Sequence, residues 1–177
     1  KLTLMKTSAD SLKKSADALN DSSLWEKKKI KKKDEKTGEE IAVEDYDWDK
    51  ITKAVKSFVE DYNDVVKEAG ESNTKDVLRN ASWMTGMTDK NSNMLAKIGI
   101  TIGKGNKLEL DEDALKQADI SSLKTIFTGY NSFVSKISQK ATGISNAANR
   151  ASATYTNNGT YSKTDSLLTS SKIDEEV

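Results

Sequence analysis

Apolar residues recur at helical spacing along most of the chain, so the sequence predicts a mainly helical protein. Between residues 3 and 20 they lie three or four positions apart, which places them on one narrow face of a helix. Residues 47–69 predict a second helix with a broader face, capped by Asp47 or Asp49 and ended by Gly70. The apolar positions are Leu4 or Met5, Ala9, Leu12, Ala16 and Leu19 in the first helix, and Ile51, Ala54, Val55, Phe58, Val59, Tyr62, Val65, Val66 and Ala69 in the second.

A third helix is predicted to begin at a cap supplied by Ser72 or Asn73 and to be interrupted at Gly86. A further helical turn around Leu95 follows it. The residues of the helix expected to face inward are Val77, Leu78, Ala81 and Met84, and the turn runs through Met94, Leu95 and Ile98.

Beyond residue 111 the pattern predicts a short helix over residues 112–118 and one long helix from Ser121 or Ser122 to Tyr155. Large apolar residues in the long helix give way to alanines beyond Ala141. Small residues let another helix approach closely, so this stretch indicates either a close neighbour or a partner outside the sequence. A weak final helix is predicted around Leu167, Leu168 and Ile173.

Residues 98–115 interrupt the helical pattern with a β-hairpin. Ile100 and Ile102 alternate with polar residues, as do Leu108 and Leu110, and a four-residue connection with two glycines lies between the pairs. Asp111 then stands at a helix N-cap position. The two carboxylates after it, Glu112 and Asp113, lie in the first turn, where they favour the positive end of the helix dipole.

Residues 24–48 separate the first two helices and are strongly charged. Six lysines between residues 27 and 33 surround Ile30, and an acidic stretch follows over residues 39–47. Folded about residues 36–38, the two arms would set opposite charges across from one another, which stabilises paired strands. We favour a protruding, charge-paired hairpin over a disordered charged loop. The predicted organisation is a helical body of residues 1–22 and 47–177 with residues 23–46 projecting from it.

Composition favours an elongated shape. Only 35% of the residues are hydrophobic and 32% are charged, which suits a rod with more surface per residue than a sphere. Proline is absent, which favours uninterrupted helices. The predicted fold class is therefore mainly α: an elongated helical bundle or coiled-coil-like hairpin, with small β-hairpins inserted between helices.

Charge and hydropathy exclude two classes of partner. Lysine plus arginine equals aspartate plus glutamate at 28 each, and only Arg79 and Arg150 are arginines, so we expect no nucleic-acid partner. No apolar run approaches the roughly 20 residues of a membrane-spanning helix, so we expect no membrane insertion. The chain begins at Lys1 rather than Met, so the sequence neither supports nor excludes a signal peptide.

Catalytic chemistry has little support in the sequence. The chain has no Cys and no His, which removes thiolate ligands, the commonest general base and the best soft nucleophile. Segments starting at Asp45 and Asp89 begin like calcium-binding loops, but both lack the Gly at position six and the Glu at position twelve. Capping accounts for the acidic residues 111–113. We therefore expect no catalytic residue, no metal site, no cofactor and no enzyme activity.

Three tryptophans are candidates for contacts between proteins. Trp25 and Trp48 flank the charged segment and are expected to pack across its base. Trp83 lies beside Met84 and Met87, and these three residues form the candidate partner contact because large aromatic side chains often anchor interfaces.

Four motifs, taken in order, resemble the flagellar filament-cap family, also called flagellar hook-associated protein 2. Phe58-Val59-Glu60-Asp61-Tyr62-Asn63 is similar to the family's Phe-Val-x-x-Tyr-Asn helix. Segments 95–100 and 108–115 follow, and Ile126-Phe127-Thr128-Gly129 resembles the opening of the family's long return helix. The resemblance covers roughly residues 50–175. Its motif and core residues are Phe58, Val59, Tyr62, Asn63, Ile98, Gly99, Ile100, Leu108, Leu110, Asp111, Ile126 and Phe127.

The resemblance implies a divergent or shortened member of that family. Such a protein would be a secreted structural component that self-associates in a ring or other oligomer and promotes flagellin assembly at the filament tip. Its partners would be flagellin or other axial flagellar proteins, and its location would be extracellular, in the bacterial flagellum or at the cell surface. Family members have large β-rich outer domains where this chain has only residues 21–46. The family's terminal coiled-coil segments are expected outside the present sequence.

A secreted surface adhesin or interaction module built on the same helices is the alternative. It would use the tip of the charged hairpin, residues 30–44, to contact a host or carbohydrate partner. A hydrolase would need two carboxylates that converge in a pocket, whereas the acidic clusters occupy cap and turn positions. Motility is therefore the expected process under the first hypothesis and cell adhesion under the alternative.

Overall fold

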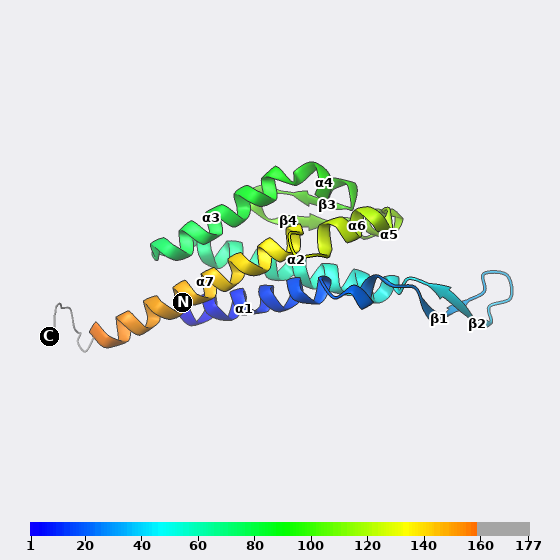
Figure 1. The fold of residues 1–177 in the computed structure, drawn as a ribbon, viewed down its shortest axis with the longest axis horizontal. Coiled ribbons are helices and arrows are strands. Elements are labelled where there is room, and N and C mark those ends of the chain that lie inside the picture. Colours follow the sequence, from blue (N-terminus) through cyan, green and yellow to red (C-terminus); the bar gives the residue numbers. More distant parts are fainter. Residues whose placement is uncertain (159–177) are drawn as a thin grey trace.

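The computed structural model describes residues 1–158. Its body is elongated and mainly helical, which confirms the predicted fold class. Three long helices run side by side: α1 (Leu2–Leu19), α2 (Trp48–Gly70) and α7 (Phe133–Asn158). A fourth, α3 (Lys75–Lys90), lies along α7 (Figure 1). The final helix predicted around residues 167–173 lies outside the described residues.

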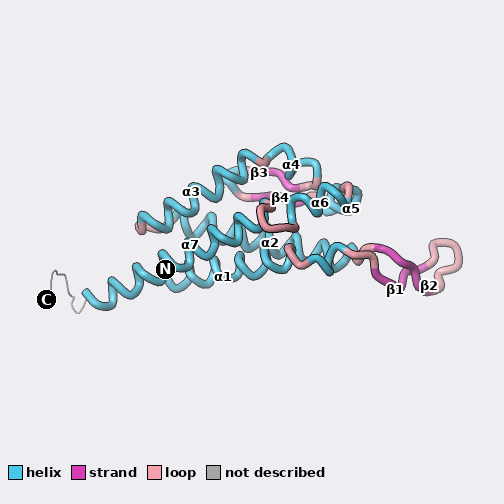
Figure 2. The backbone as a smooth tube through the Cα atoms, in the orientation of Figure 1, coloured by secondary structure: helices cyan, strands magenta, loops and turns pink. Residues whose placement is uncertain are grey.

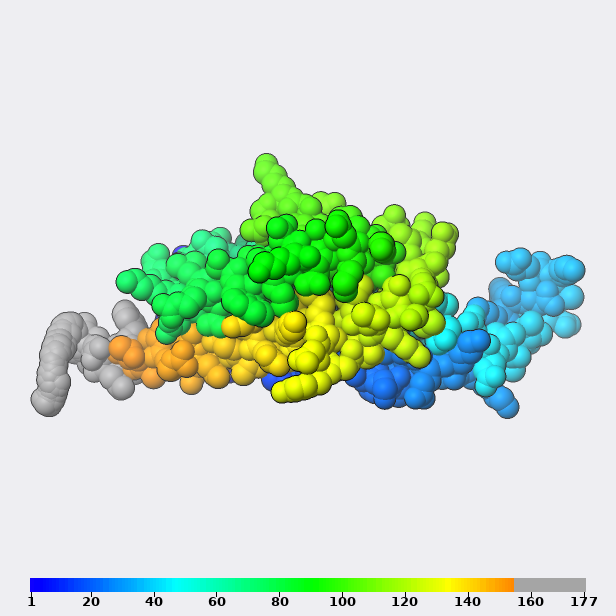
Figure 3. Space-filling model, turned by 45° about the horizontal axis from the view of Figure 1, so that its top comes forward, coloured from blue at the N-terminus to red at the C-terminus, as the bar shows by residue number. Residues whose placement is uncertain are grey.

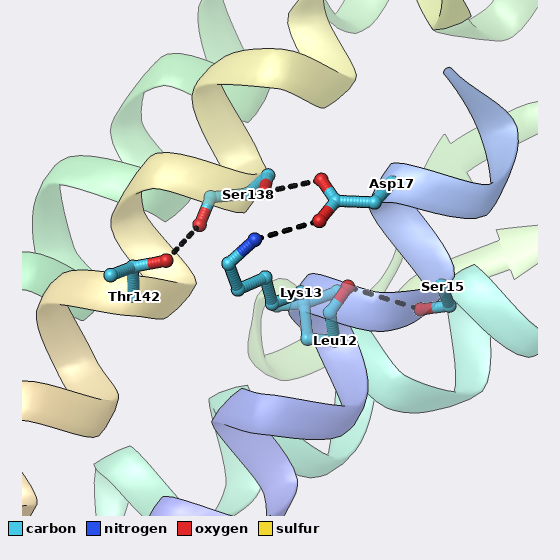
Figure 4. Close-up of polar contacts among 6 residues, drawn as sticks. All are labelled: Leu12, Lys13, Ser15, Asp17, Ser138 and Thr142. Carbon is cyan, nitrogen blue, oxygen red and sulfur yellow. Dashed lines mark hydrogen bonds and ion pairs between the residues drawn. The ribbon is translucent and has the colours of Figure 1, made fainter. Parts of the chain in front are cut away.

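Helices α1 and α7 are antiparallel and are joined by polar contacts seven residues apart. The Ser145 hydroxyl donates to Asp10 at 2.6 Å. The Ser138 hydroxyl donates to Asp17 at 2.7 Å, and Figure 4 shows this second contact. Lys6 and Lys13 pair with the same two carboxylates at 2.7 Å. Seven residues are close to two helical turns, so the spacing repeats the same contact along one edge of the helix pair.

The apolar residues between α1 and α7 follow the same spacing. On α1 the buried positions alternate between large and small side chains, and on α7 alanines replace larger residues toward the C-terminal half. This explains how the two helices approach closely, as the alanine-rich stretch predicted. The buried residues are Met5, Ala9, Leu12, Ala16 and Leu19 on α1, and Val134, Ile137, Ala141, Ile144 and Ala148 on α7.

Helix α2 is capped by Asp47, whose side chain accepts a hydrogen bond from the Lys50 backbone N–H at 3.2 Å. Asp47 is one of the two caps that the sequence predicted. The buried ring of Phe58 lies at the centre of an aromatic cluster. Its centroid is 6.2 Å from Tyr62, 6.4 Å from Phe127 and 6.3 Å from Phe133. The edge-to-face packing against Phe127 and Phe133 links α2 to α6 (Ile120–Phe127) and α7.

The charged segment forms an antiparallel hairpin of β1 (Lys28–Lys33) and β2 (Glu40–Asp45), which confirms the favoured prediction over a disordered loop. Its turn is closed by hydrogen bonds from the Asp34 N–H to the Glu39 carbonyl and from the Gly38 N–H to the Asp34 carbonyl, at 2.7 and 2.8 Å. A φ of +72° at Gly38 explains the glycine there. The hairpin extends from the end of the body where α1 finishes and α2 begins (Figures 1 and 2).

Between α1 and this hairpin, a short 3₁₀-helix, η1 (Ser22–Trp25), brings Trp25 into the core. The Trp25 ring stacks on Phe127 at 5.5 Å, and its indole N–H donates to the Leu19 carbonyl at 2.7 Å. Trp48 instead packs edge-on against Tyr46 at 6.1 Å. The prediction that Trp25 packs across the hairpin base is therefore wrong, because the aromatic cluster of the body takes up that ring.

The second hairpin also lies where the pattern predicts it. It consists of β3 (Ile100–Ile102) and β4 (Leu108–Leu110), joined through η2 (Lys104–Asn106). Helix α4 (Ser92–Lys97) precedes it, and α5 (Glu112–Gln117) and α6 (Ile120–Phe127) follow it. These short elements cover the end of the body nearer the charged hairpin (Figure 1).

Two predicted helix boundaries are wrong. Helix α3 continues through Gly86 without interruption, because its inner face is held by buried residues on both sides of the glycine. The long helix predicted from residue 121 to Tyr155 is two helices, α6 and α7, separated by residues 128–132. Gly129 has a φ of +100° in this break, and the Asn20 side chain pairs with its backbone N–H and C=O at 2.9 and 3.3 Å.

Three smaller expectations also differ from the structure. The residue at the N-cap of α3 is Thr74 rather than Ser72 or Asn73, and Asp119 caps α6 rather than Ser121 or Ser122. Leu78, expected to face inward, is exposed on α3.

Candidate partner-binding surface

Helix α3 divides sharply into an inner and an outer face. Its inner face packs on α2 and α7, and Trp83 stands on the outer face with 47% of its surface exposed. The Lys140 ammonium, from α7, lies 4.2 Å from the centre of the Trp83 ring. This cation–π contact holds the ring at the boundary of the two helices. The buried inner residues are Val77, Ala81, Met84 and Thr88.

A depression lies beside the Trp83 ring, along the line where α3 and α7 meet. Its lining residues are Trp83, Gly86, Met87, Lys90, Asn91 and Lys136. Gly86 leaves the outer face of α3 open here, since a Cβ atom at that position would meet nothing within 4 Å. Figure 3 shows α3 and α7 next to each other on this side of the molecule. We call the lining residues together with Lys140 the Trp83 surface.

The Trp83 surface combines apolar contact area with positive charge. Trp83 and Met87 supply the apolar part, and the ammonium groups of Lys90, Lys136 and Lys140 surround it. Asn91 anchors the end of α3 by donating from its side chain to the Met87 carbonyl at 2.9 Å. Such a surface can bind a segment that presents an apolar side chain next to carboxylates.

The three residues of the predicted partner contact do not share one face. Trp83 is exposed and Met87 is half-buried in the lining of the depression, whereas Met84 has 0% exposure and packs in the core. The helical period explains the correction: Met84 lies three and four positions from Ala81 and Thr88, which are both buried. Met84 therefore contributes to folding, and its backbone carbonyl accepts the Thr88 hydroxyl at 2.9 Å.

The motif residues of α2 lie inside the body. Phe58, Val59 and Tyr62 are buried, and the Tyr62 hydroxyl donates to the Thr88 hydroxyl oxygen on α3 at 2.9 Å. Burial raises the pKa of Tyr62 to about 12, against the opposing effect of the Thr88 hydrogen bond. The phenol therefore stays neutral and joins α2 to α3.

Asn63, next to Tyr62, has a separate role. Its amide nitrogen donates to the Leu108 carbonyl at 2.9 Å, and its amide oxygen accepts from the Leu108 N–H at 2.7 Å. One side chain thus satisfies both backbone groups at the open edge of β4. The motif placed Asn63 among the residues of interest, but only the structure shows that it clamps the second hairpin to α2.

Gly99 and Asp111 meet where the second hairpin begins and ends. The Asp111 N–H donates to the Gly99 carbonyl at 2.8 Å, and the Asp111 side chain caps α5 by accepting from the Ala114 N–H at 3.1 Å. Gly99 has a φ of +92°, and a Cβ there would lie 2.6 Å from the Asp111 carbonyl oxygen. Only glycine fits this close approach.

The remaining motif residues surround this junction. Ile98, Ile100 and Leu108 are buried, and Leu110 is half-buried against the core. Ile126 and Phe127 are also buried, at the end of α6. The motif residues are thus mostly core and junction positions, while the Trp83 surface lies outside them. Sequence reasoning missed Lys136 and Lys140, which the α7 spacing could have placed opposite α3.

No group of three or more histidine, cysteine, aspartate or glutamate side chains is placed to hold a metal ion within residues 1–158. Over the same stretch, none of the helices is long and apolar enough to span a membrane. The acidic residues 111–113 are exposed at the start of α5.

The fold and the surface together define an elongated, mainly helical body with two small hairpins and a basic, apolar contact area. A model of the C-terminal region of flagellar hook-associated protein 2 matches residues 72–175. The chain belongs to this family, which supplies cap-type structural proteins of the flagellum, an extracellular appendage. The match includes the Trp83 surface and begins after the Phe58–Asn63 motif. No curated protein and no solved structure matches the chain significantly.

Proposed function

We propose that this protein self-associates and promotes the assembly of flagellin at the tip of the flagellar filament. The observation that carries the proposal is the match of residues 72–175 to the C-terminal region of flagellar hook-associated protein 2. Helices α3 to α7 all lie inside the matched residues. In this proposal the protein is secreted and acts through contacts with other chains rather than through catalysis.

The Trp83 surface is the part of the body that we assign to an axial flagellar partner, flagellin in the first place. Trp83 supplies an aromatic anchor that is already held in position by Lys140. An anchor that is ordered before binding loses little side-chain freedom when a partner docks. The three lysines around it select a partner segment with carboxylates beside an apolar side chain.

The test adds purified protein, in amounts well below those of flagellin, to depolymerised flagellin and short filament seeds. Filament length is followed by electron microscopy, and the added protein is located with a gold label. A cap-type protein is expected at filament ends and is expected to change the rate of extension. Label that is absent from the ends, with an unchanged rate, would contradict the proposal.

A pair of variants tests whether the cap-type role depends on the Trp83 surface. Trp83→Ser removes the exposed ring, whereas Leu78→Ser removes another exposed apolar side chain of α3 that lies outside the Trp83 surface. We expect Trp83→Ser to reduce end labelling at least several-fold and Leu78→Ser to leave it unchanged. Equal labelling by both variants rejects the Trp83 surface while leaving the cap-type role in place.

A further inference from the structure

The charged hairpin has two open edges. Strands β1 and β2 form a two-stranded sheet within the described part of the chain. The hairpin stands clear of the helical body at one end of the molecule (Figures 1 and 3). Each strand therefore has a row of backbone N–H and C=O groups directed away from its partner. A two-stranded sheet gains stability when a third strand is added, because more backbone groups pair and more side-chain area is covered.

The two edges have opposite charge. Strand β1 reads Lys-Lys-Ile-Lys-Lys-Lys, with five lysines and no acidic residue. Strand β2 reads Glu-Ile-Ala-Val-Glu-Asp, with three carboxylates and no lysine. Within the hairpin, the register sets Lys28 opposite Asp45, Lys29 opposite Glu44 and Lys33 opposite Glu40. The contact that closes one hairpin is therefore a contact between a basic and an acidic strand.

The same hairpin also has apolar side chains on one face. Ile30 and Val43 lie opposite each other and are half-buried, and Ile41, two positions from Val43, is 42% exposed. Side chains two positions apart share a face of a strand, so these three residues form one apolar row across the sheet. A further hairpin placed at either edge would extend this row.

We propose that a second copy of this chain docks here, with the open edge of its acidic strand β2 against the open edge of the basic strand β1. Pairing of like edges would set lysine against lysine or carboxylate against carboxylate, which is unfavourable. The lysines thus block β1–β1 pairing, as edge lysines do in other sheets, while leaving the acidic edge of another copy as a suitable partner. Charge complementarity and the apolar row are the two observations that identify a second copy of this chain as the partner.

This contact joins two different surfaces, so each bound copy still has one basic or one acidic edge to offer. Contacts of this kind form rings when the rotation between copies closes, and filaments when it does not. A symmetric two-fold dimer through like edges is excluded by the charge argument. The inference rests on the self-association proposed above and specifies the surfaces that meet.

Charge variants test the inference in solution. Glu40→Lys with Glu44→Lys gives a hairpin with two basic edges, and Lys29→Glu, Lys31→Glu and Lys33→Glu together give one with two largely acidic edges. We expect the mass of the unaltered protein, measured by light scattering, to rise with concentration, and each variant alone to remain monomeric. An equimolar mixture of the two variants is expected to recover at least half of the mass increase. Recovery by mixing also shows that neither variant failed merely by opening its own hairpin.

A five-residue exchange provides the matched control. Lys29→Glu, Lys31→Glu and Lys33→Glu combined with Glu40→Lys and Glu44→Lys make β1 net acidic and β2 net basic, while keeping opposite signs across the hairpin. This variant is expected to associate as the unaltered protein does. Association of the two single-sign variants to the same extent as the unaltered protein would overturn the inference, as would a monomer at every concentration. A monomer at every concentration also contradicts the self-association in the proposed function, whereas assembly at filament ends is tested independently by the flagellin assay.

Disulfide trapping reports which edges meet. The chain has no native cysteine, so introduced thiols are unambiguous. One sample contains a Lys31→Cys variant and a size-tagged Ala42→Cys variant, both altered at exposed strand positions. Mild oxidation is expected to give the mixed disulfide in several-fold excess over either like pair, and an Ala18→Cys variant on exposed α1 is expected to give no such excess. A predominance of the Lys31→Cys like pair would overturn the proposed edge pairing.

Discussion

The side-chain amide of Asn63 pairs with both backbone groups of Leu108, 45 residues further along the chain. It imitates the two hydrogen bonds that a neighbouring strand would make, and it does so from a helix. The side-chain amide of Asn20 likewise pairs with the backbone N–H and C=O of Gly129. Two asparagines thus fix two of the places where the path of the chain departs from the helical pattern: the second hairpin and the break between α6 and α7.

Replacing Asn63 by Ala removes both hydrogen bonds to Leu108. Each is worth about 0.5–1.5 kcal/mol, so the free energy of unfolding is expected to fall by about 1–3 kcal/mol. Hydrogen exchange at Leu108 and Ile100 is expected to accelerate more than exchange in α1. The exposed Asn93→Ala is the control and is expected to leave both measurements unchanged. Unaltered exchange at Leu108 in Asn63→Ala would show that the clamp is not needed.

Two glycine substitutions are expected to have opposite effects. Gly99→Ala places a Cβ 2.6 Å from the Asp111 carbonyl at a φ of +92°, and is expected to lower the free energy of unfolding by at least about 2 kcal/mol. Gly86→Ala adds a methyl group to open space inside α3 and is expected to raise it by about 0.5–1 kcal/mol through helix propensity. Urea unfolding measures both. A loss of stability in Gly86→Ala would contradict the continuous helix.

Phe58→Ala tests the aromatic cluster. The Phe58 ring contacts Tyr62, Phe127 and Phe133, and it is fully buried. A cavity in place of a buried phenylalanine costs about 3–5 kcal/mol. Urea unfolding is expected to show a loss of this size, with a red shift of Trp25 fluorescence as Phe127 loses its support. A shift in the urea midpoint within measurement error would exclude Phe58 from the core.

Acid is expected to weaken the contact between α1 and α7. Hydrogen bonds from Lys6 and Ser145 lower the pKa of Asp10 below its ordinary value of 3.8. Burial acts to raise the pKa of Asp17, but hydrogen bonds from Lys13 and Ser138 outweigh it and lower that pKa as well. A lowered pKa in the folded state gives stability that is fully present above about pH 4 and is lost as the pH falls through the folded value.

The measurement compares urea midpoints at pH 7 and pH 3. Asp10→Asn combined with Asp17→Asn is expected to lose less stability between the two pH values than the unaltered protein does. Asp89→Asn, at an exposed position of α3, serves as the control and should follow the unaltered protein. The same drop in all three proteins would remove these two carboxylates as the cause.

Asp61 is expected to act in the opposite direction. Burial, aided by the nearby charges of Asp64 and Glu60, raises its pKa above 3.8, while a hydrogen bond with Ser15 opposes this. A raised folded pKa favours the folded state below the unfolded value, and this advantage is lost as the pH rises through the folded value. Asp61→Asn should therefore increase the urea midpoint at pH 7 and change it little at pH 3. Asp89→Asn, at an exposed position of α3, is the control, and a decrease at pH 7 in Asp61→Asn would refute the argument.

The order of helices and hairpins could be predicted because each element has its own period and its own turn residues. The apolar face of α2 and the alternation around Ile100 and Leu108 are local properties. The break at residues 128–132 could not be found in the same way, because apolar residues continue at helical spacing through Tyr130 and Phe133. Tyr130 is 83% exposed, and the break is held by Asn20, more than one hundred residues earlier.

The partner-binding surface was predictable only in part. Trp83 is a conspicuous residue of α3, but two of the three lysines around it, Lys136 and Lys140, belong to α7. Met84 and Met87 could be separated only by knowing which side of α3 meets the body. Gly86 misled the prediction because a glycine on the outer side of a well-packed helix weakens it without ending it.

The antiparallel pairing of α1 and α7 places the start of α1 and the end of α7 at one end of the body, while the loop between α1 and α2 lies at the other. The chain leaves the helical body after Trp25 and returns to it before Trp48. The segment between these two residues is therefore an insertion that projects from the helical body. Sequences of very different size could replace residues 28–45 there while Tyr46 and the Asp47 cap of α2 stay in place. A fluorescent domain or an epitope inserted at this point would be displayed beside the start of α2, about 35 Å along that helix from its other end at Gly70, given 23 residues at 1.5 Å each.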